Sequence, residues 1–173
     1  VQGDVSNNGA AVLVLQGGVK TQTVVSQGCR PIGERFVITA IQQNMITGLG
    51  GKPALDVLKS LYEKLPTTEQ EAMQNGFHIG RVVSEYQDEY QMGDFLIRNV
   101  VGVDPDLRAV VVADYLKVGQ TVQFHIRDYE SASLELNQLL SQVETPCAAA
   151  LLFTCNGRGT RLFEVESHDA TTV

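Results

Sequence analysis

The sequence predicts an α+β fold in which mixed, largely antiparallel β-sheets are packed by about three helices. Short runs rich in Val, Ile, Thr and Phe recur along most of the chain, separated by Gly, Asn and Pro. Such runs are typical of strands joined by turns. Only three segments place apolar residues at the spacing of an amphipathic helix. The 173 residues correspond to one domain or to two small ones.

The first quarter of the chain is expected to form strands. Residues 11–15 and 19–25 are β-rich runs on either side of Gly17-Gly18, and a glycine pair in that position predicts a hairpin. Residues 28–33 contain Gly and Pro and are expected to form a loop. Two further strands are predicted at residues 36–42 and 45–49.

Three helices are predicted from caps and apolar spacing. The first begins near Pro53, because proline suits the first helical position, and it buries Leu55, Leu58, Tyr62 and Leu65 on one face. The second is short, begins at Thr67 or Thr68, and ends at Asn75-Gly76. The third covers residues 129–143 and is expected to bury Leu136, Leu139, Leu140 and Val143.

The remaining β-rich runs are predicted strands at residues 77–83, 95–101, 109–113, 121–127, 147–153 and 161–165. In the run 121–127, Val122, Phe124 and Ile126 face one side, and His125 and Arg127 face the other. The run 147–153 is continuously apolar, which predicts a strand covered on both faces.

Composition and charge exclude several classes of partner. The 13 basic and 20 acidic residues give a net charge of −7, whereas nucleic acids and anionic membranes attract basic surfaces. Neither nucleic acid nor membrane is therefore expected as a partner. The first residues lack the features of a signal peptide, and no run approaches the ~18 apolar residues of a membrane span. A cytoplasmic location is expected.

The strongest local signal for a binding site is the glycine-rich loop at residues 155–159. Its glycines allow close backbone approach, Asn156 offers a donor and an acceptor, and Arg158 offers a fork for a carboxylate or phosphate. The loop follows the apolar run 147–153, and ligands of open sheets lie beyond the ends of strands. The loop predicts a site for an anionic or zwitterionic ligand. Alternatively, it is a tight turn whose arginine pairs internally.

Two other places carry polar residues in unusual positions. Cys29 and Arg35 have the C-x5-R spacing of a phosphatase loop, but Pro31 removes a backbone donor and no helix follows, so the match is weak. Arg98 and Asn99 are adjacent within an apolar strand and point to opposite faces. At least one of them is therefore expected to make a buried hydrogen bond or to line a ligand pocket.

The histidines and cysteines give no metal or disulfide signal. His78, His125 and His168 are far apart in the sequence and lack a second ligand at helical spacing, so neither a metal nor a cofactor is predicted. His78 and His125 are expected to be hydrogen-bonded strand histidines. The three cysteines, an odd number, show no regular spacing and predict no disulfide framework.

A series of segments resembles the FIST family. They are residues 28–33 (GCRPIG), 51–55 (GKPAL), 93–99 (GDFLIRN), Gly119 with 122–124 (VQF), and 151–159 (LLFTCNGRG). The resemblance implies that residues 1–50 are the tail of an N-terminal FIST domain. It implies that residues 51–173 are a C-terminal FIST domain that is incomplete at its C-terminus. Exposed sheet edges are expected where strands would then be missing.

The resemblance implies a sensory, ligand-binding module of intracellular signalling that acts with a signalling partner protein or domain. It suggests small molecules, amino acids in particular, as ligands, and it brings no catalytic residues. From their match to the motifs and their chemistry, the expected ligand-binding residues are Arg30, Arg98, Asn99, Cys155, Asn156, Gly157 and Arg158.

Two alternative functions stay open at this point. A protein-interaction scaffold without a small ligand would fold but would not respond to ligands. A thiol-dependent enzyme using Cys155 or Cys29 as nucleophile would need a depressed thiol pKa and would be alkylated quickly at neutral pH.

Overall fold

A computed structural model describes residues 8, 10, 12–87, 89–144 and 146–173. Its strands are β1 (Arg30–Gln42), β2 (Met45–Leu49), β3 (Lys52–Pro53), β4 (Phe77–Val82), β5 (Phe95–Asp104), β6 (Ala109–Val112) and β7 (Thr121–Ile126). Its helices are α1 (Ala54–Lys64), α2 (Thr67–Gln74), α3 (Tyr129–Leu140), the 3₁₀ turn η1 (Asn156–Arg158), α4 (Thr160–Phe163) and α5 (His168–Thr172). Within the described residues no helix has the length and apolarity needed to cross a membrane.

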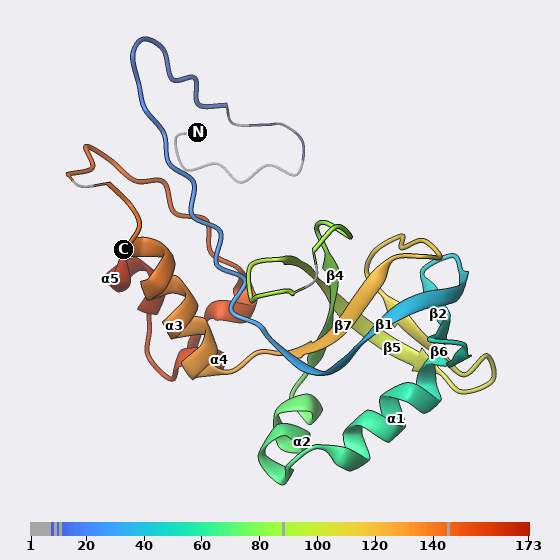
Figure 1. Cartoon of the computed structure of the whole chain (residues 1–173). Coiled ribbons are helices and arrows are strands. Elements are labelled where there is room, and N and C mark those ends of the chain that lie inside the picture. Colours follow the sequence, from blue (N-terminus) through green and yellow to red (C-terminus); the bar gives the residue numbers. More distant parts are fainter. Residues whose placement is uncertain (1–7, 9, 11, 88, 145) are drawn as a thin grey trace.

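The strands form a closed antiparallel barrel (Figure 1). Six strands follow one another in the order β1-β7-β4-β5-β6-β2, and the pairing of β1 with β2 closes the ring, while β3 pairs with β2 only. The predicted arrangement of mixed sheets packed by helices was therefore wrong, because the sheet closes on itself and all of its pairings are antiparallel.

Closure of the barrel depends on two long strands, each of which pairs with two neighbouring strands. The first part of β1 pairs with β7 and the second part with β2, with register shifts along the way. In the same way β5 pairs first with β4 and then with β6, across a shift between Val100 and Gly102. Such irregularities bend a strand and increase its twist, which is what a barrel requires. The alternation of residue types does not show where these shifts fall.

Alternate residues of the strands fill the interior of the barrel. Ile38, Ile46, Ile79 and Val110 are completely buried there, together with Phe124 of β7. Helix α1 adds the buried residues Leu55, Leu58 and Leu61 to the same cluster. Each large apolar side chain removed from water contributes about 1.5–3 kcal/mol, so this interior is the main source of stability.

Both helices before β4 confirm the sequence analysis. Helix α1 starts directly after Pro53, which occupies the cap position rather than the first helical position. Helix α2 starts at Thr67 and ends at Gln74, with Asn75 as its C-cap. The strands predicted at 45–49, 77–83, 109–113 and 121–127 are also present, each within one residue of its predicted end.

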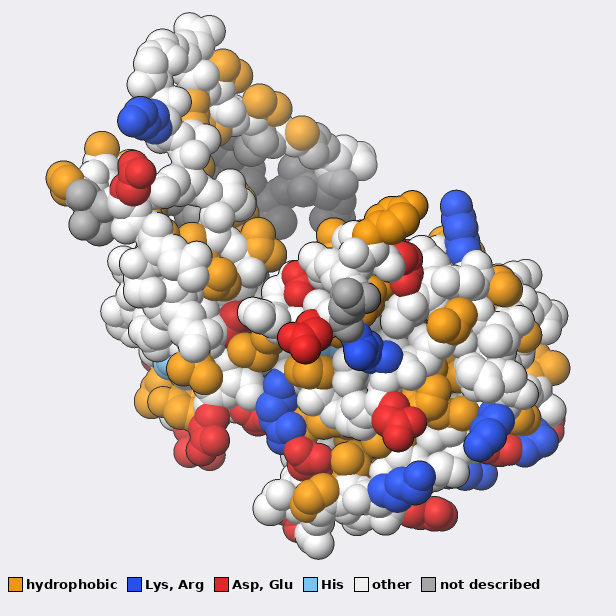
Figure 2. Space-filling view, viewed as in Figure 1, with side chains coloured by type: hydrophobic (Ala, Val, Ile, Leu, Met, Phe, Trp, Pro, Cys, Tyr) orange, Lys and Arg blue, Asp and Glu red, His pale blue; other side chains and the backbone are white. Residues whose placement is uncertain are grey.

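Several predicted strands are wrong, all of them outside the barrel. Residues 12–15 and 19–25 form no strand, and Val12 is 82% exposed; Ala11 lies outside the described residues. The run 147–153 also forms no strand, and its Phe153 is 90% exposed. Figure 1 shows these two segments as extended arms beyond the barrel, and Figure 2 shows apolar side chains on the surface of the N-terminal arm. A β-rich run becomes a strand only where a neighbouring strand pairs with it.

The C-terminal part is more helical than predicted. The run 161–165 is not a strand, because α4 occupies most of it, and α5 was not expected. Helix α3 is present and is capped by the Asp128 carboxylate, which accepts a hydrogen bond from the Ser131 amide at 2.8 Å. Of its predicted buried stripe only Leu136 is buried; Ala132 and Glu135 are buried instead. The predicted loop at 28–33 was also wrong in part, since β1 begins at Arg30.

Candidate functional site

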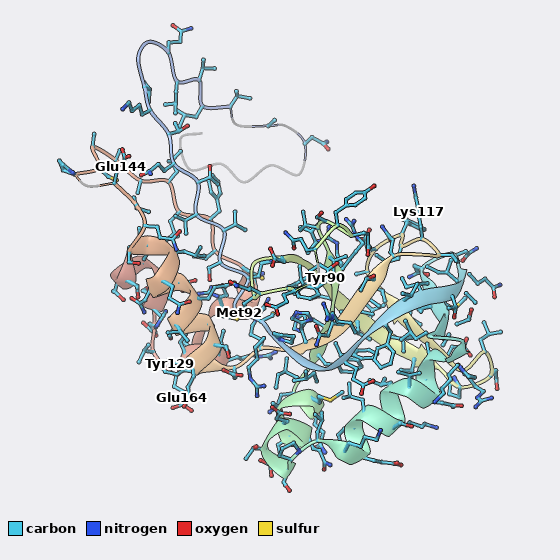
Figure 3. All side chains as sticks on the ribbon, in the orientation of Figure 1. Tyr90, Met92, Lys117, Tyr129, Glu144 and Glu164 are labelled. Atoms are coloured by element: carbon cyan, nitrogen blue, oxygen red, sulfur yellow. The ribbon has the colours of Figure 1, made fainter. Side chains whose placement is uncertain are left out.

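The candidate site lies where the outer face of β7 meets the C-terminal helices. β7 continues through Arg127 and Asp128 directly into α3, and Figure 1 shows α3, α4 and α5 grouped at one side of the barrel. The loop between β4 and β5, which carries Tyr90 and Met92, runs between these helices and the barrel in the view of Figure 3. Tyr90 packs against Phe95 at a ring distance of 5.7 Å. The outer wall of the barrel is therefore covered here rather than open to water.

Arg158 is the anchor of the C-terminal segment. Its side chain is 6% exposed and makes a bidentate ion pair with Asp169, with Nε 2.6 Å and Nη2 2.9 Å from the two carboxylate oxygens. The guanidinium holds the pKa of Asp169 below its usual value. The remaining nitrogen, Nη1, is buried and has no hydrogen-bond partner among the residues that the structure describes. A bidentate pair fixes the guanidinium plane, so the direction of this unused donor is fixed as well.

Gly28 brings the main chain against that unused donor. A Cβ atom at Gly28 would lie 2.5 Å from Arg158 Nη1 and 2.8 Å from the Ala132 side chain, and the residue has a φ of +65°. Its amide donates to Glu135 Oε2 at 2.6 Å. Only glycine combines this conformation with this close approach. The segment before β1 and the η1 turn are thereby held together.

Arg127 supplies a second guanidinium at the same place. Its Nε is buried and finds no hydrogen-bond partner in the described part of the chain, and a Cβ atom at Gly157 would lie 2.8 Å from its Nη1. Arg127 and Arg158 both lower the pKa of the Cys29 thiol through their charge, so both lie close to that residue. Two arginines, each with an unsatisfied donor, thus approach the two glycine positions 28 and 157.

Cys29 belongs to the same cluster, and its thiol is protonated. It is 2% exposed, and its burial raises the pKa of the thiol in spite of the opposing charge of Arg127. A nucleophilic cysteine needs a lowered pKa. The surroundings of Cys29 therefore favour a packing role, whereas Cys155 is exposed on the η1 side.

Two histidines complete the buried outer face. His78 of β4 and His125 of β7 are direct cross-strand neighbours. Burial lowers the pKa of each to about 4, with a further lowering from the charge of Arg127 at His78. His125 Nε2 and His78 Nδ1 are buried without partners. The expectation of hydrogen-bonded strand histidines is confirmed for His125, whose Nδ1 lies 3.0 Å from the carbonyl oxygen of Gln123.

The structure separates the residues that the sequence analysis grouped. Arg30 pairs with Asp128 at 2.8 Å and with Glu69 at 2.7 Å, which ties β1 to α2 and to the cap of α3. Arg98 pairs with Asp114 at 2.7 Å. Both arginines are thus engaged in ion pairs away from the Arg158 nitrogen. Asn99 is exposed but lies opposite His78 across β4 and β5.

The loop residues occupy different depths. Cys155, Asn156 and Gly157 are exposed, while the side chain of Arg158 is buried. Cys155 accepts a hydrogen bond from the Gly157 amide at 3.4 Å, which shapes the turn. In the described residues no strand leads directly into this loop, because α3 lies between β7 and the η1 turn. The Arg158–Asp169 pair therefore positions the loop, and not the end of a sheet strand.

Sequence reasoning missed Arg127, Glu135 and Asp169 as members of the site. A signal for Arg127 was present, because the alternation in β7 places it and His125 on the face opposite the apolar core. Nothing comparable exists for Asp169 or Glu135, which reach the site only through the folding of α5 and α3 onto the barrel.

Two surface grooves lie elsewhere. One of about 360 Å³ is apolar and is lined by residues of α1, α2 and β4 such as Leu58, Tyr62 and Phe77. The other, about 290 Å³, lies between residues 22–24 and the end of α3. Neither contains an arginine or a histidine. The concentration of unsatisfied polar atoms makes the Arg127–Arg158 cluster the stronger candidate for ligand chemistry.

Comparison with known families gives a match along nearly the whole chain. Residues 54–173 match the FIST C domain and residues 1–52 match the FIST N domain. The chain belongs to the FIST family. The predicted resemblance is therefore confirmed, and FIST domains are generally described as sensory domains of signal transduction. In the structure, strands from both matched segments form one barrel, with β1 and β2 from the first and β4–β7 from the second.

The similar proteins with curated sequences are uncharacterized. One from Mycobacterium tuberculosis is 42% identical over 160 residues, and one from Mycobacterium bovis is 40% identical over the same length. Each alignment covers 90% of this chain and 42% of the relative, so the chain spans less than half the length of the curated relatives it matches. No solved structure matches the chain.

Proposed function

We propose that this chain is the ligand-binding part of a sensory signal-transduction protein, and that its ligand is a small carboxylate, an amino acid being the suspected compound. The observation that carries the proposal is the pair of buried, unsatisfied guanidinium donors, Arg127 Nε and Arg158 Nη1. Both belong to arginines that lie against glycine backbone on the same side of the barrel.

The energetics favour an added anion at this point. A buried donor without an acceptor costs about 1–3 kcal/mol, and more when it is charged. The acidic groups nearby are already engaged: both oxygens of Asp169 accept from Arg158, and Glu135 Oε2 accepts from the Gly28 amide and the Ser26 hydroxyl. A ligand carboxylate that accepts from both arginines would satisfy the two donors through charge-assisted hydrogen bonds.

The surroundings indicate how a ligand would enter the site and how its binding would affect a signalling partner. The exposed turn at Gly157 lies against Arg127 Nη1, so a ligand would enter where this turn moves aside. Arg158 is bonded to Asp169 of α5, and His168 beside it stacks on Phe163 of α4 at 3.7 Å. A ligand held by Arg158 would therefore act on both short helices, which a signalling partner protein or domain could contact.

Thermal shift and calorimetric titration with a panel of carboxylates, including amino acids, test the proposal. A ligand at 100 times its Kd adds about 2.7 kcal/mol, which raises Tm by several degrees at roughly 2–4 °C per kcal/mol. The Arg127→Gln variant should weaken binding about 10- to 100-fold, because a hydrogen bond to a charged group contributes about 1.5–3 kcal/mol.

Arg108→Gln is the matched control. It removes the same charge from an exposed arginine that pairs with Asp56 of α1 and should bind like the wild type. Equal affinities of the two variants would contradict the proposal. A cooperative melt with no response to any carboxylate would favour the protein-interaction scaffold instead.

A further inference from the structure

We propose that His125 determines the specificity of this site: its Nε2 atom accepts a hydrogen bond from a hydroxyl or ammonium group on the carbon next to the ligand's carboxylate. The site would then prefer 2-hydroxy or 2-amino acids to plain carboxylic acids. This inference rests on the proposed carboxylate site at Arg127 and Arg158 and adds the group that selects among carboxylates.

The hydrogen bonding of the ring defines its free atom. His125 is completely buried, and its Nδ1 lies 3.0 Å from the carbonyl oxygen of Gln123. A carbonyl oxygen can only accept, so Nδ1 carries the hydrogen and Nε2 carries a lone pair. Nε2 is buried and has no hydrogen-bond partner within residues 8, 10, 12–87, 89–144 and 146–173. Burial lowers the pKa of the ring to about 4, which keeps Nε2 an acceptor at neutral pH.

The chain places this acceptor two residues before Arg127. His125 lies near the end of β7 on the face away from the barrel core, and Arg127 follows two residues later in the link to α3; in extended backbone, residues two apart lie roughly 6.5–7 Å apart. The charge of Arg127 lowers the pKa of His78, the direct cross-strand neighbour of His125, so the guanidinium lies close to this pair of histidines. A compact acid with a donor on the carbon next to its carboxylate can span such a gap. Its carboxylate accepts from Arg127 and its donor bonds to His125 Nε2, and each hydrogen bond is about 2.9 Å long.

The neighbouring groups leave Nε2 for a ligand. Gly80 allows the imidazole to lie over β4, since a Cβ atom there would be 2.4 Å from His125 Cε1. Phe95 packs edge-on against the ring at 4.8 Å and offers no polar atom. His78 across the strand has its own unsatisfied Nδ1, so the two histidines do not satisfy each other.

Three acids with the same carbon skeleton test the inference: propionate without a donor, lactate with a hydroxyl, and alanine with an ammonium group. Each is titrated into the wild type and into His125→Phe, which keeps an aromatic ring but removes the acceptor. His125→Gln is the matched variant, because its side-chain oxygen restores an acceptor.

We expect the wild type to bind lactate or alanine about five- to tenfold more tightly than propionate, the value of one hydrogen bond. His125→Phe should bind all three acids equally, at the wild-type affinity for propionate, and His125→Gln should regain part of the preference. Which of lactate and alanine binds better tells hydroxyl from ammonium. Equal binding of all three acids by the wild type, or an unchanged preference in His125→Phe, would overturn the inference.

The experiment separates this inference from the one it rests on. If the wild type binds none of the acids and Arg127→Gln has no effect on any carboxylate, the proposed site itself is wrong. If carboxylates bind through Arg127 without the preference, only the role of His125 is wrong. Should both His125 variants fail to fold, the Nε2 nitrogen-15 shift of wild-type His125 serves instead. It should move with lactate or alanine and not with propionate; no movement with any of them contradicts the inference.

Discussion

The two faces of β7 bury opposite kinds of side chain. Toward the barrel interior, Val122, Phe124 and Ile126 are almost completely buried among apolar neighbours. On the outer face, His125 and Arg127 carry buried nitrogen atoms without partners. The inner face is what a stable core requires, since apolar groups lose nothing by leaving water. The outer face lowers stability, because each unsatisfied polar atom loses its hydrogen bonds to water, and such a cost is common at binding sites.

The largest effect should come from breaking the inner face. Phe124→Ala removes a fully buried ring from the centre of the barrel and leaves a cavity, so the free energy of unfolding should fall by about 3–5 kcal/mol. Urea denaturation followed by circular dichroism measures the change through the midpoint at constant slope. A loss below 1 kcal/mol would mean that the barrel interior is not the main core.

Lowering the pH should protonate the histidines of the outer face, and so reduce the stability of the fold, before it protonates the carboxylates. The pKa of His125 is about 4 in the fold and about 6.5 in an unfolded chain, so the unfolded state binds more protons between these values. Stability is therefore complete above pH 6.5 and falls as the pH is lowered toward 4, by about 3 kcal/mol for this buried histidine. His78 acts in the same direction, but less strongly because it is partly exposed and screened by solvent.

Urea midpoints at intervals from pH 7.5 to 4.5 measure this decline. The carboxylates with lowered pKa values, Asp114, Asp128 and Asp169, lose their contribution only as the pH falls below about 4, so they do not explain a change in this window. His125→Phe is the control, and it should keep only the smaller His78 part of the decline. A flat profile in the wild type would mean that the histidines are not buried as neutral rings.

The contrast between the two faces was only half visible in the sequence. The alternation in residues 121–127 assigned Val122, Phe124 and Ile126 to one side and His125 and Arg127 to the other, as the structure has them. Helix α1 and the strands β2, β4, β6 and β7 followed equally from local pattern, because each has the residues and turns that its conformation needs. What local pattern could not supply was barrel closure, which depends on the register shifts of β1 and β5.

The candidate site could be predicted less well than the fold. Arg158 and Gly157 were chosen from their loop, but Arg30 and Arg98 were chosen by residue type, and each turned out to have an ion-pair partner. The apolar runs 12–15 and 147–153 show the opposite error, since they have strand composition but no strand to pair with. Both errors have one cause: a partner distant in the chain decides whether an arginine is satisfied or a β-rich run becomes a strand.

The smallest effect, and the one that separates stability from binding, is the stability of His125→Phe at pH 7.5. The replacement keeps an aromatic ring against Phe95 and removes an unsatisfied nitrogen from a fully buried position, but it also removes the Nδ1 hydrogen bond to Gln123. The gain and the loss are each about 1 kcal/mol, so the free energy of unfolding should change by less than about 1 kcal/mol in either direction. Urea denaturation of the ligand-free protein measures it. A loss of 3 kcal/mol or more would show that His125 is a structural residue like Phe124. A near-neutral change together with lost discrimination among the three acids would mean that the fold retains this histidine for recognition.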